Sequence, residues 1–222
     1  MPPGAFFHEP RQFELLATGV LPELARARRR VRLWSAGCGA GEEAWSLAIA
    51  VEEAALPPGV EVEILATEAD RQALAIAAEA VYRDDQMRPV SSERRRRHFV
   101  RGVGPRRGLW RVIAPLRDRV ELCQLDLDGP WLDAPWLDGP WLDGPWLDGP
   151  WPATAQTGTR FDVVFCHAPV ARRVPRDADL LIRQLAAVLA PGGALFLGRP
   201  VEPDGLPGLV RCAPGVYRRC TG

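Results

Sequence analysis

The sequence contains no lysine and no asparagine, so all 28 of its basic residues are arginine. Without lysine there is no P-loop of the GK[ST] kind, no Schiff base and no pyridoxal phosphate site. The arginines are balanced by 28 acidic residues, and the formal net charge is zero. Binding to nucleic acid or to a membrane surface calls for a basic excess, so we expect neither partner.

Long apolar runs and paired cysteines are missing as well. No stretch approaches the ~20 apolar residues of a membrane span, and the first residues do not have the pattern of a secretory signal. The cysteines are odd in number and widely spaced: Cys38, Cys123, Cys166, Cys212 and Cys220. This spacing favours buried thiols over disulfides or a zinc site. We therefore expect a cytoplasmic protein without a metal site.

The 222 residues, 47% of them apolar, suit one α/β domain over residues 1–222. Apolar residues at three- and four-residue spacing predict a helix that ends before Arg28. Further along, the pattern predicts a strand over residues 31–37 that runs into a glycine turn, and then a helix over 42–55. A second strand over 60–68 and a second helix over 70–82 follow. This order opens a doubly wound, mostly parallel sheet of the Rossmann-like type.

The second half predicts further elements of such a sheet. In chain order we expect a helix and loop over 94–108, an antiparallel hairpin and sheet strand over 109–126, a strand over 161–168, a helix over 177–193, a strand over 194–198 and a terminal hairpin over 209–220. The arginine runs at 28–30 and 94–97 are expected to be solvated faces at the ends of elements, and the alternative for them is a role in docking a partner.

The turn after the first strand carries the first chemical signal. It reads GCGAG, with glycines at Gly37, Gly39 and Gly41. Glycines let the backbone approach a ligand closely, and the following helix offers free N–H groups. Glu42 and Glu43 stand where a pyrophosphate would bind and would repel it, but they suit a positively charged ligand such as S-adenosylmethionine. Glu68, at the end of the second strand, is placed to accept hydrogen bonds from ribose hydroxyls. The pattern favours S-adenosylmethionine over NAD.

Several longer segments resemble the motifs of the CheR-type chemotaxis receptor methyltransferases. RLWSAGCGAGEEAWSLAIA and EILATEAD are similar to the family's WSAGCSTGEEPYSLA and ILATDID. GAFFHEPRQF resembles its TxFFRxPxxF, and FDVVFCHA its FDxIFCRN strand. The likeness covers nearly everything except a run of repeats at 127–151, although the family's N-terminal helical domain has no counterpart in this sequence.

The resemblance implies a class I S-adenosylmethionine-dependent methyltransferase that esterifies glutamate side chains in the cytoplasmic domain of chemoreceptors. It also implies a small inserted β-subdomain, which we expect at 94–122. By position, Glu42 or Glu43 would hold the methionyl end of the cofactor, Glu68 the ribose, and Asp126 with Leu127 the adenine. The glycine turn, His167 and Ala168 would complete the cofactor site, which contains no metal.

The substrate side departs from the family pattern. The arginine of the family's FFR is His8, and the CRN motif becomes Cys166, His167 and Ala168. Arg172 stands where the family's active-site tyrosine would fall. His8, His167 and Arg172 are therefore the candidates for positioning a carboxylate substrate. The favoured alternative for the two histidines is drift or a surface position, and Arg172 could instead begin a solvated helix. Two alternatives to receptor methylation stay open: a non-catalytic or degenerate cofactor-binding module, and a methyltransferase for another carboxylate.

The repeats consist of one pentapeptide, LDGPW, written five times from Leu127 to Trp151, with Ala134 as the single deviation. A proline at every fifth residue excludes a continuous helix or a central strand. Repeated tryptophans could bind a partner, but an inert insertion into a surface loop is favoured. Because the first unit follows Asp126 directly, the repeats are expected over or beside the cofactor pocket.

Overall fold

The computed structural model describes residues 4–129, 131–133, 160–172, 174–198 and 208–220. Seven strands form one sheet in the order β6-β2-β1-β7-β8-β10-β9. Their bounds are Arg30–Ala36 (β1), Glu61–Glu68 (β2), Val120–Gln124 (β6), Phe161–Cys166 (β7), Leu189–Leu197 (β8), Leu209–Ala213 (β9) and Val216–Arg219 (β10). The pairs among β6, β2, β1, β7 and β8 are parallel, while β10 runs antiparallel to both of its neighbours.

The strand order changes direction between β1 and β7. From β1 the chain moves outward through β2 to β6, and then returns to the other side of β1 as β7. A doubly wound sheet binds its ligand at such a switch point, outside the carboxyl ends of the strands. The expected doubly wound, mostly parallel α/β fold is confirmed.

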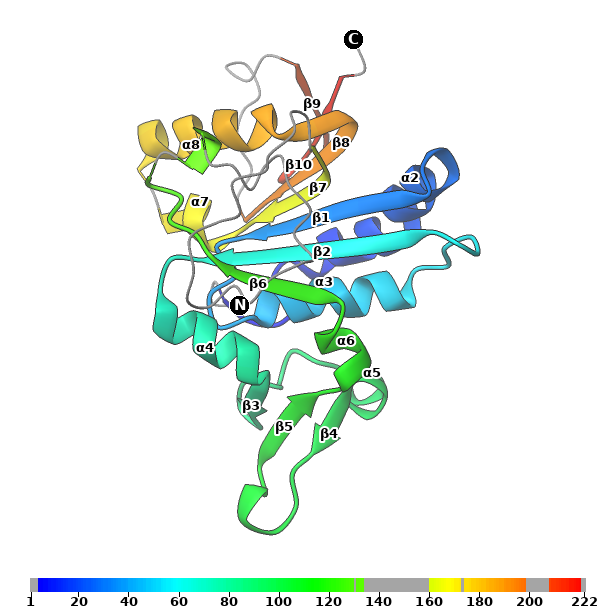
Figure 1. Ribbon diagram of the computed structural model, residues 1–222, viewed down its shortest axis with the longest axis vertical. Helices are drawn as coiled ribbons and strands as arrows, with labels where there is room; N and C mark the ends of the chain where they lie inside the picture. The colour runs from blue at the N-terminus through cyan, green and yellow to red at the C-terminus, as the bar shows by residue number, and fades with distance from the viewer. Residues whose placement is uncertain (1–3, 130, 134–159, 173, 199–207, 221–222) are drawn as a thin grey trace.

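Helices cover both faces of the sheet (Figure 1). One core contains α1 (Pro10–Leu15), a π-helical turn (Leu16–Val20), α2 (Leu21–Ala27) and α3 (Glu42–Glu53). The other core contains α8 (Pro175–Ala187). Neighbouring strand residues alternate between the two cores, as in Leu33 and Trp34, because successive side chains point to opposite faces.

A second, three-stranded sheet extends from the main one at the lower end of Figure 1. It is antiparallel, in the order β3-β5-β4, and is built from Val81–Arg83 (β3), Leu109–Val112 (β5) and Phe99–Arg101 (β4). The helices around it are α4 (Arg71–Glu79), α5 (Ser92–His98) and α6 (Ala114–Arg117). Its first strand precedes residue 94, so the expected range of 94–122 omits part of this sheet.

Three predicted elements have different bounds in the structure. The helix expected to reach residue 82 ends at Glu79, because Ala80 adopts a left-handed conformation (φ 53°) and the chain enters β3. β5 pairs with β3 and β4 and forms no hairpin within 109–126. The helix expected over 177–193 ends at Ala187, and the following LAPGG belongs to β8 because Leu189 pairs with Phe161.

Two arginines expected on solvated faces tie elements together. Arg28 forms an ion pair with the buried Asp162 of β7 and donates to the carbonyl of Pro191 (2.7 Å). The other oxygen of Asp162 accepts the backbone N–H of Arg32 in β1 (2.9 Å). Arg94 pairs with Glu53 (2.7 Å) and lies over the ring of Phe7. Arg28 and Arg94 thus depart from the predicted solvated faces, whereas Arg29, Arg30, Arg96 and Arg97 are exposed as expected.

The cysteines divide by position. Cys38, Cys123 and Cys166 are buried free thiols as expected, whereas Cys212 and Cys220 are exposed. Both exposed thiols belong to the terminal segment around β9 and β10, where one face of the hairpin meets solvent. Among the described residues, no helix has the length and apolar character that a membrane crossing requires.

Candidate functional site at the carboxyl edge of the sheet

The glycine turn joins β1 to α3 at the switch point. The backbone N–H groups of Gly37 and Cys38 both donate to the carbonyl of Thr67 in β2 (2.8 Å each). Gly37, Gly39 and Gly41 all have positive φ angles, of 77°, 59° and 97°, which side-chain-bearing residues rarely adopt. The turn is thus folded against the end of the neighbouring strand.

The three glycines differ in what surrounds them. A Cβ atom on Gly37 would lie 2.2 Å from Cγ of Pro169, while one on Gly39 would meet nothing within 4 Å. A Cβ atom on Gly41 would collide with Trp45, Tyr82 and Ala77. Gly39 therefore leaves open space beside the turn, whereas Gly41 serves the packing of α3 and lines neither of the cavities described below.

Glu68 organises the backbone around the turn. Its Oε2 accepts the N–H of Gly39 (2.8 Å), and its Oε1 accepts the N–H groups of Ala69 (2.8 Å) and Asp70 (3.1 Å). A carboxylate offers about four lone-pair positions, so Oε2 keeps capacity for one further donor. Because Glu68 also lines the larger cavity, that donor can come from a ligand.

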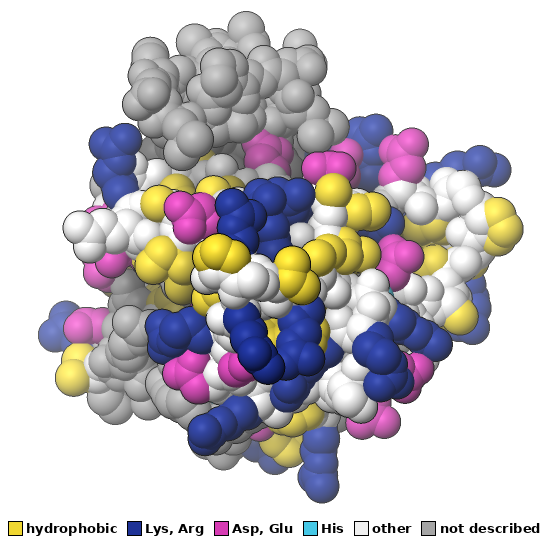
Figure 2. Space-filling view, turned by 90° about the horizontal axis from the view of Figure 1, so that it is seen from below, with side chains coloured by type: hydrophobic (Ala, Val, Ile, Leu, Met, Phe, Trp, Pro, Cys, Tyr) yellow, Lys and Arg dark blue, Asp and Glu magenta, His cyan; other side chains and the backbone are white. Residues whose placement is uncertain are grey.

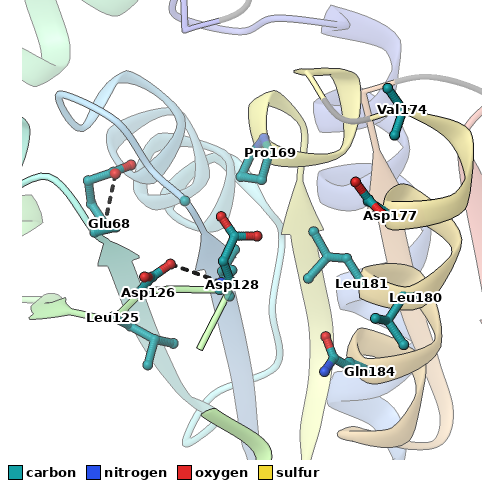
Figure 3. Close-up of a pocket in the computed structure, with 13 residues that line it drawn as sticks. Glu68, Leu125, Asp126, Asp128, Pro169, Val174, Asp177, Leu180, Leu181 and Gln184 are labelled. Carbon is teal, nitrogen blue, oxygen red and sulfur yellow. Dashed lines mark hydrogen bonds between the residues drawn. The ribbon is translucent and has the colours of Figure 1, made fainter. Parts of the chain in front are cut away.

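An open cavity of about 810 Å³ lies between the ends of β2 and β6 and helix α8 (Figure 3). Glu68, Leu125, Asp126 and Asp128 form the strand side, while Asp177, Leu180, Leu181 and Gln184 of α8 form the opposite side. Gly37 and Pro169 lie between them. The cavity has both an apolar wall and a row of carboxylates, which suits a flat, hydrogen-bonding ligand of drug-like size.

Asp126 and Leu127 follow β6 and both line this cavity. Asp126 is exposed and accepts the N–H of Asp128 (2.9 Å), while Leu127 is buried. The first repeat unit continues to Trp131, whose ring packs against Trp34 at a centroid distance of 5.3 Å. Leu127 and Trp131 of the first unit therefore belong to the core that adjoins the cavity, and the repeats from residue 134 onward lie outside the described residues.

A second cavity, of about 20 Å³, lies behind Gly37. Such a volume holds about one water molecule. It is lined by the N-terminal segment, the glycine turn and the end of β7, through Gly4, Ala5, His8, Phe13, Gly37, Cys38, Gly39, Glu43, His167 and Ala168. Gly37 lines both cavities, so the two form adjacent parts of one site.

The two acids at the start of α3 point to different places. Glu43 lines the small cavity, and its Oε1 accepts the hydroxyl of Ser35 (2.6 Å). Burial raises the pKa of Glu43 to about 7, although hydrogen bonds from Ser35 and from the backbone of His167 act in the opposite direction. Glu42 lines neither cavity and accepts a long hydrogen bond from Gln86 (3.4 Å). The geometry thus favours Glu43 as the acid of the site.

His167 is buried and uncharged, so it is neither a surface residue nor a cation for a substrate carboxylate. Its Nε2 lies 2.9 Å from Oε1 of Gln12, and its Nδ1 lies 3.3 Å from Oε2 of Glu43. Burial lowers its pKa to about 3, and the neighbouring His8 acts in the same direction. The ring of His8 lies 5.6 Å from that of His167, and burial also lowers its pKa.

The other candidate positions have different outcomes. Ala168 lines the small cavity and begins α7 (Ala168–Arg172). Arg172 ends that helix, and its side chain is outside the described part of the chain. The sequence interpretation missed Gln12, Ser35 and Pro169, which contact the site residues. Gln12 is the hardest to find, since its partner His167 lies 155 residues away.

Comparison with known proteins identifies the family. Residues 4–134 match the model described as the CheR methyltransferase, SAM binding domain. The chain belongs to this family. It is a class I methyltransferase domain, and its cofactor is S-adenosylmethionine.

Relatives within the CheR family align over most of the chain. Chemotaxis protein methyltransferase 1 of Pseudomonas aeruginosa is 33% identical over 96% of this chain and 72% of its own length. The chemotaxis protein methyltransferase of Salmonella typhimurium is 30% identical over 87% of this chain and 58% of its own. The chain therefore spans between about three fifths and three quarters of these relatives. Among solved structures, the O-methyltransferase TomG of Streptomyces achromogenes matches with a TM-score of 0.44 at 18% identity, covering 96% of this chain and 80% of that one.

The residues of the site suit the cofactor of the CheR family. The large cavity has the volume for an adenosyl group, and Glu68 has a lone pair to offer a hydroxyl. The methionyl ammonium group is a cation, and Glu43 is the carboxyl group behind the glycine turn. Gly39 leaves the open space that a closely approaching ligand needs.

Proposed function

We propose that this domain methylates glutamate side chains in the cytoplasmic part of chemoreceptors. Membership of the CheR family supports this, together with relatives whose names describe chemotaxis protein methyltransferases. The single observation that carries the proposal is the arrangement of Glu68, Asp126 and Glu43 around the glycine turn at the switch point of the sheet. Five free cysteines support a reducing, cytoplasmic setting.

Each of these residues would contact a different part of the cofactor. Glu68 accepts a hydrogen bond from a ribose hydroxyl, Asp126 and Leu127 hold the adenine, and Glu43 faces the methionyl ammonium group. The cofactor supplies an already activated methyl group. Gly39 lets the backbone pass close to it, because a Cβ atom there would meet open space, whereas the Cβ position of Gly37 is taken by Pro169. Ala168 adds an apolar contact beside His167.

The chain's part in the reaction is positioning rather than proton transfer. A glutamate carboxylate is ionised at neutral pH, so no general base is needed to make it a nucleophile. The site must hold it in line with the methyl group and exclude water. His8, at the mouth of the small cavity, is the described residue best placed to orient an incoming carboxylate, and it does so as a neutral hydrogen-bonding group.

A surface for the receptor is proposed on the small sheet. Figure 2 shows the face that includes this sheet, with arginine side chains gathered over much of it. Arg101, Arg106, Arg107 and Arg111 are exposed there. A receptor segment rich in glutamates carries the opposite charge, and such complementarity chiefly raises the rate of association.

Calorimetry with S-adenosylmethionine, followed by transfer of a labelled methyl group to receptor-bearing membranes, tests the proposal. We expect micromolar binding and base-labile label on receptor glutamates, with both lost in Glu68→Ala. Absence of binding by the intact chain would refute the cofactor assignment. Binding without transfer would refute the receptor assignment.

The arginine surface has its own test. The double change Arg106→Glu with Arg107→Glu should slow receptor methylation about tenfold at low salt, and much less at high salt, because exposed charges are screened. Affinity for the cofactor should stay unchanged. Equal slowing at both salt concentrations would argue against charge-steered docking.

One observation favours a second candidate, a cofactor-binding module without methyl transfer. At the position of the family's arginine, the chain has a buried, uncharged His167 that is already bonded to Gln12. A site that lacks this cation offers less attraction to a carboxylate. The transfer assay above separates the two functions.

A further inference from the structure

A chain of buried polar side chains crosses the wall of the small cavity. It runs from Gln12 of α1 through His167 and Glu43 to Ser35 of β1. The side chains of His167 and Glu43 are only 3% and 11% exposed. Buried polar groups of this kind need complementary donors and acceptors, so the protons in the chain can be assigned from its geometry.

The orientation of Gln12 fixes the first proton. Its Nε2 donates to the carbonyl oxygens of Leu197 (3.0 Å) and Pro214 (3.3 Å). The reversed amide would direct its oxygen at these two acceptors, which is unfavourable. Oε1 of Gln12 therefore faces Nε2 of His167, and this nitrogen must carry a hydrogen to donate.

The neutral ring of His167 then has a bare Nδ1. A neutral imidazole has one donor and one acceptor nitrogen, so a hydrogen on Nε2 leaves a lone pair on Nδ1. Nδ1 is buried and lacks a hydrogen-bond partner as long as its neighbour offers only lone pairs. That neighbour is Oε2 of Glu43, at 3.3 Å.

A protonated Glu43 completes the chain. An ionised carboxylate only accepts hydrogen bonds, whereas the neutral acid can donate from Oε2 to Nδ1 while Oε1 accepts from Ser35. Every member then has a partner: Gln12 accepts from His167, His167 accepts from Glu43, and Glu43 accepts from Ser35.

We propose that Glu43 is held as the neutral acid by His167, which Gln12 fixes in the Nε2–H form, and that Glu43 releases its proton to solvent when a cation binds beside it. The inference rests on the proposed function, since the cation is the ammonium group of the cofactor. The balance is simple: one O–H bond of Glu43 breaks, the proton goes to the buffer, and the carboxylate pairs with the ammonium. Gln12 is thus a positioning residue that acts through His167.

The surroundings of Glu43 suit a neutral acid. The titratable groups that line the small cavity with Glu43 are His167 from the end of β7, His8 from the N-terminal segment and Cys38 from the glycine turn. Glu68 at the end of β2 and Glu42 of α3 lie close to Cys38 and are bonded to other groups. Burial lowers the pKa of both histidines and raises that of the Cys38 thiol well above its ordinary value, so all three are uncharged near neutrality. The two remaining groups are acids and would repel a further negative charge.

Calorimetry of the full chain with S-adenosylhomocysteine tests the proton release. The titration is run in two buffers of different ionisation enthalpy, since the difference in heat counts the protons exchanged. With the pKa of Glu43 near 7, we expect about one proton released near pH 6 and almost none near pH 8.5. Binding without proton release near pH 6 would overturn the inference and leave the proposed function standing. No binding at all would overturn the proposed function.

Glu43→Gln is the matched variant. Its amide can donate to His167 and accept from Ser35, so it keeps the hydrogen-bond chain and should fold. We expect it to bind S-adenosylhomocysteine with affinity lowered about tenfold and without release of a proton. Release of as many protons as from the unaltered chain would contradict the assignment of the proton to Glu43.

A spectroscopic test needs no ligand. In nitrogen-labelled protein, with only three histidines in the chain, His167 should show the neutral Nε2–H form from about pH 5 to pH 8. Gln12→Leu should remove this preference, whereas Gln72→Leu, at an exposed glutamine of α4, should not. A charged ring, or the Nδ1–H form, in the unaltered chain would overturn the inference.

Discussion

The two cavities on either side of Gly37 are built on different principles. The large cavity is open, and its carboxylates Glu68, Asp126 and Asp128 are at least partly exposed to water. Behind the small one, the side chains of Gln12, His167, Glu43 and Ser35 are almost wholly buried, neutral and bonded to one another, and they form the closed side of the site. At one sheet edge, then, charge is kept where water can solvate it and is removed where water is excluded. The following changes test that division, from the largest expected effect to the smallest.

Replacing the glycine shared by both cavities should have the largest effect. Gly37→Ala brings a Cβ atom within 2.2 Å of Pro169 at a φ of 77°, so we expect a loss of about 3 to 4 kcal/mol in the free energy of unfolding. Gly39→Ala meets open space and should lose only about 1 to 2 kcal/mol. Urea unfolding measures both, and equal losses would mean that Pro169 yields easily.

The closed side should give the protein a pH dependence of its own. Because the folded-state pKa of Glu43 is raised from 4.5 to about 7, the folded protein binds this proton more tightly than the unfolded chain. The resulting stabilisation is full below about pH 4.5 and is lost as the pH rises to about 7, by up to ~3 kcal/mol. Glu43→Gln should remove this part of the slope in urea unfolding.

Glu121 is the control on an open surface. Burial and then the charge of Glu63 raise its pKa to about 7 as well, but it is only partly buried. Solvent screening should make the change in slope smaller in Glu121→Gln than in Glu43→Gln. A larger change in Glu121→Gln would reverse the comparison between closed and open surroundings.

Loss of Glu68 should weaken ligand binding on the open side. Glu68→Ala removes an acceptor for the ligand and leaves the N–H groups of Gly39, Ala69 and Asp70 without their partner. We expect the Kd for S-adenosylhomocysteine to rise about 100-fold, as for the loss of a charged hydrogen-bond acceptor. Glu61→Ala, at the far end of β2, should leave the Kd unchanged in the same calorimetric titration.

The smallest effect is expected at Asp126. Its side chain is exposed, so its interactions are screened by water. Asp126→Asn should change the Kd by less than about threefold in either direction and leave the unfolding curve in place. A tenfold change would show that the charge at this position matters more than its exposure indicates.

The open side was predictable because its residues follow one another along local elements. The glycine turn comes after β1, Glu68 ends β2 and Asp126 follows β6, and parallel strands bring such positions to one edge. The resemblance to the CheR family then identified the expected ligand as S-adenosylmethionine. Gly41 and Glu42 line neither cavity, since Gly41 packs against Trp45 and Tyr82 and Glu42 accepts a hydrogen bond from Gln86.

The closed side depends on contacts that no local pattern contains. Gln12 meets His167 and Leu197 from the far end of the chain, so the charge state of His167 follows from the fold. The same limit explains the errors in element bounds. LAPGG has a composition that is typical of the end of a helix, but its pairing with β7 makes it the first part of β8.

Asp162 offers a last consequence, for the history of the chain. One of its oxygens pairs with Arg28, the residue that caps α2, and the other accepts the backbone N–H of Arg32 in β1. The alignment of β7 beside β1 is therefore specified by contacts with β1 and the residues just before it. The register of β7 therefore does not depend on the length of the connection from β6 to β7. Lengthening a loop also has only a small entropic cost. Duplication of a pentapeptide in that connection is therefore a nearly neutral event for the domain, open to later selection.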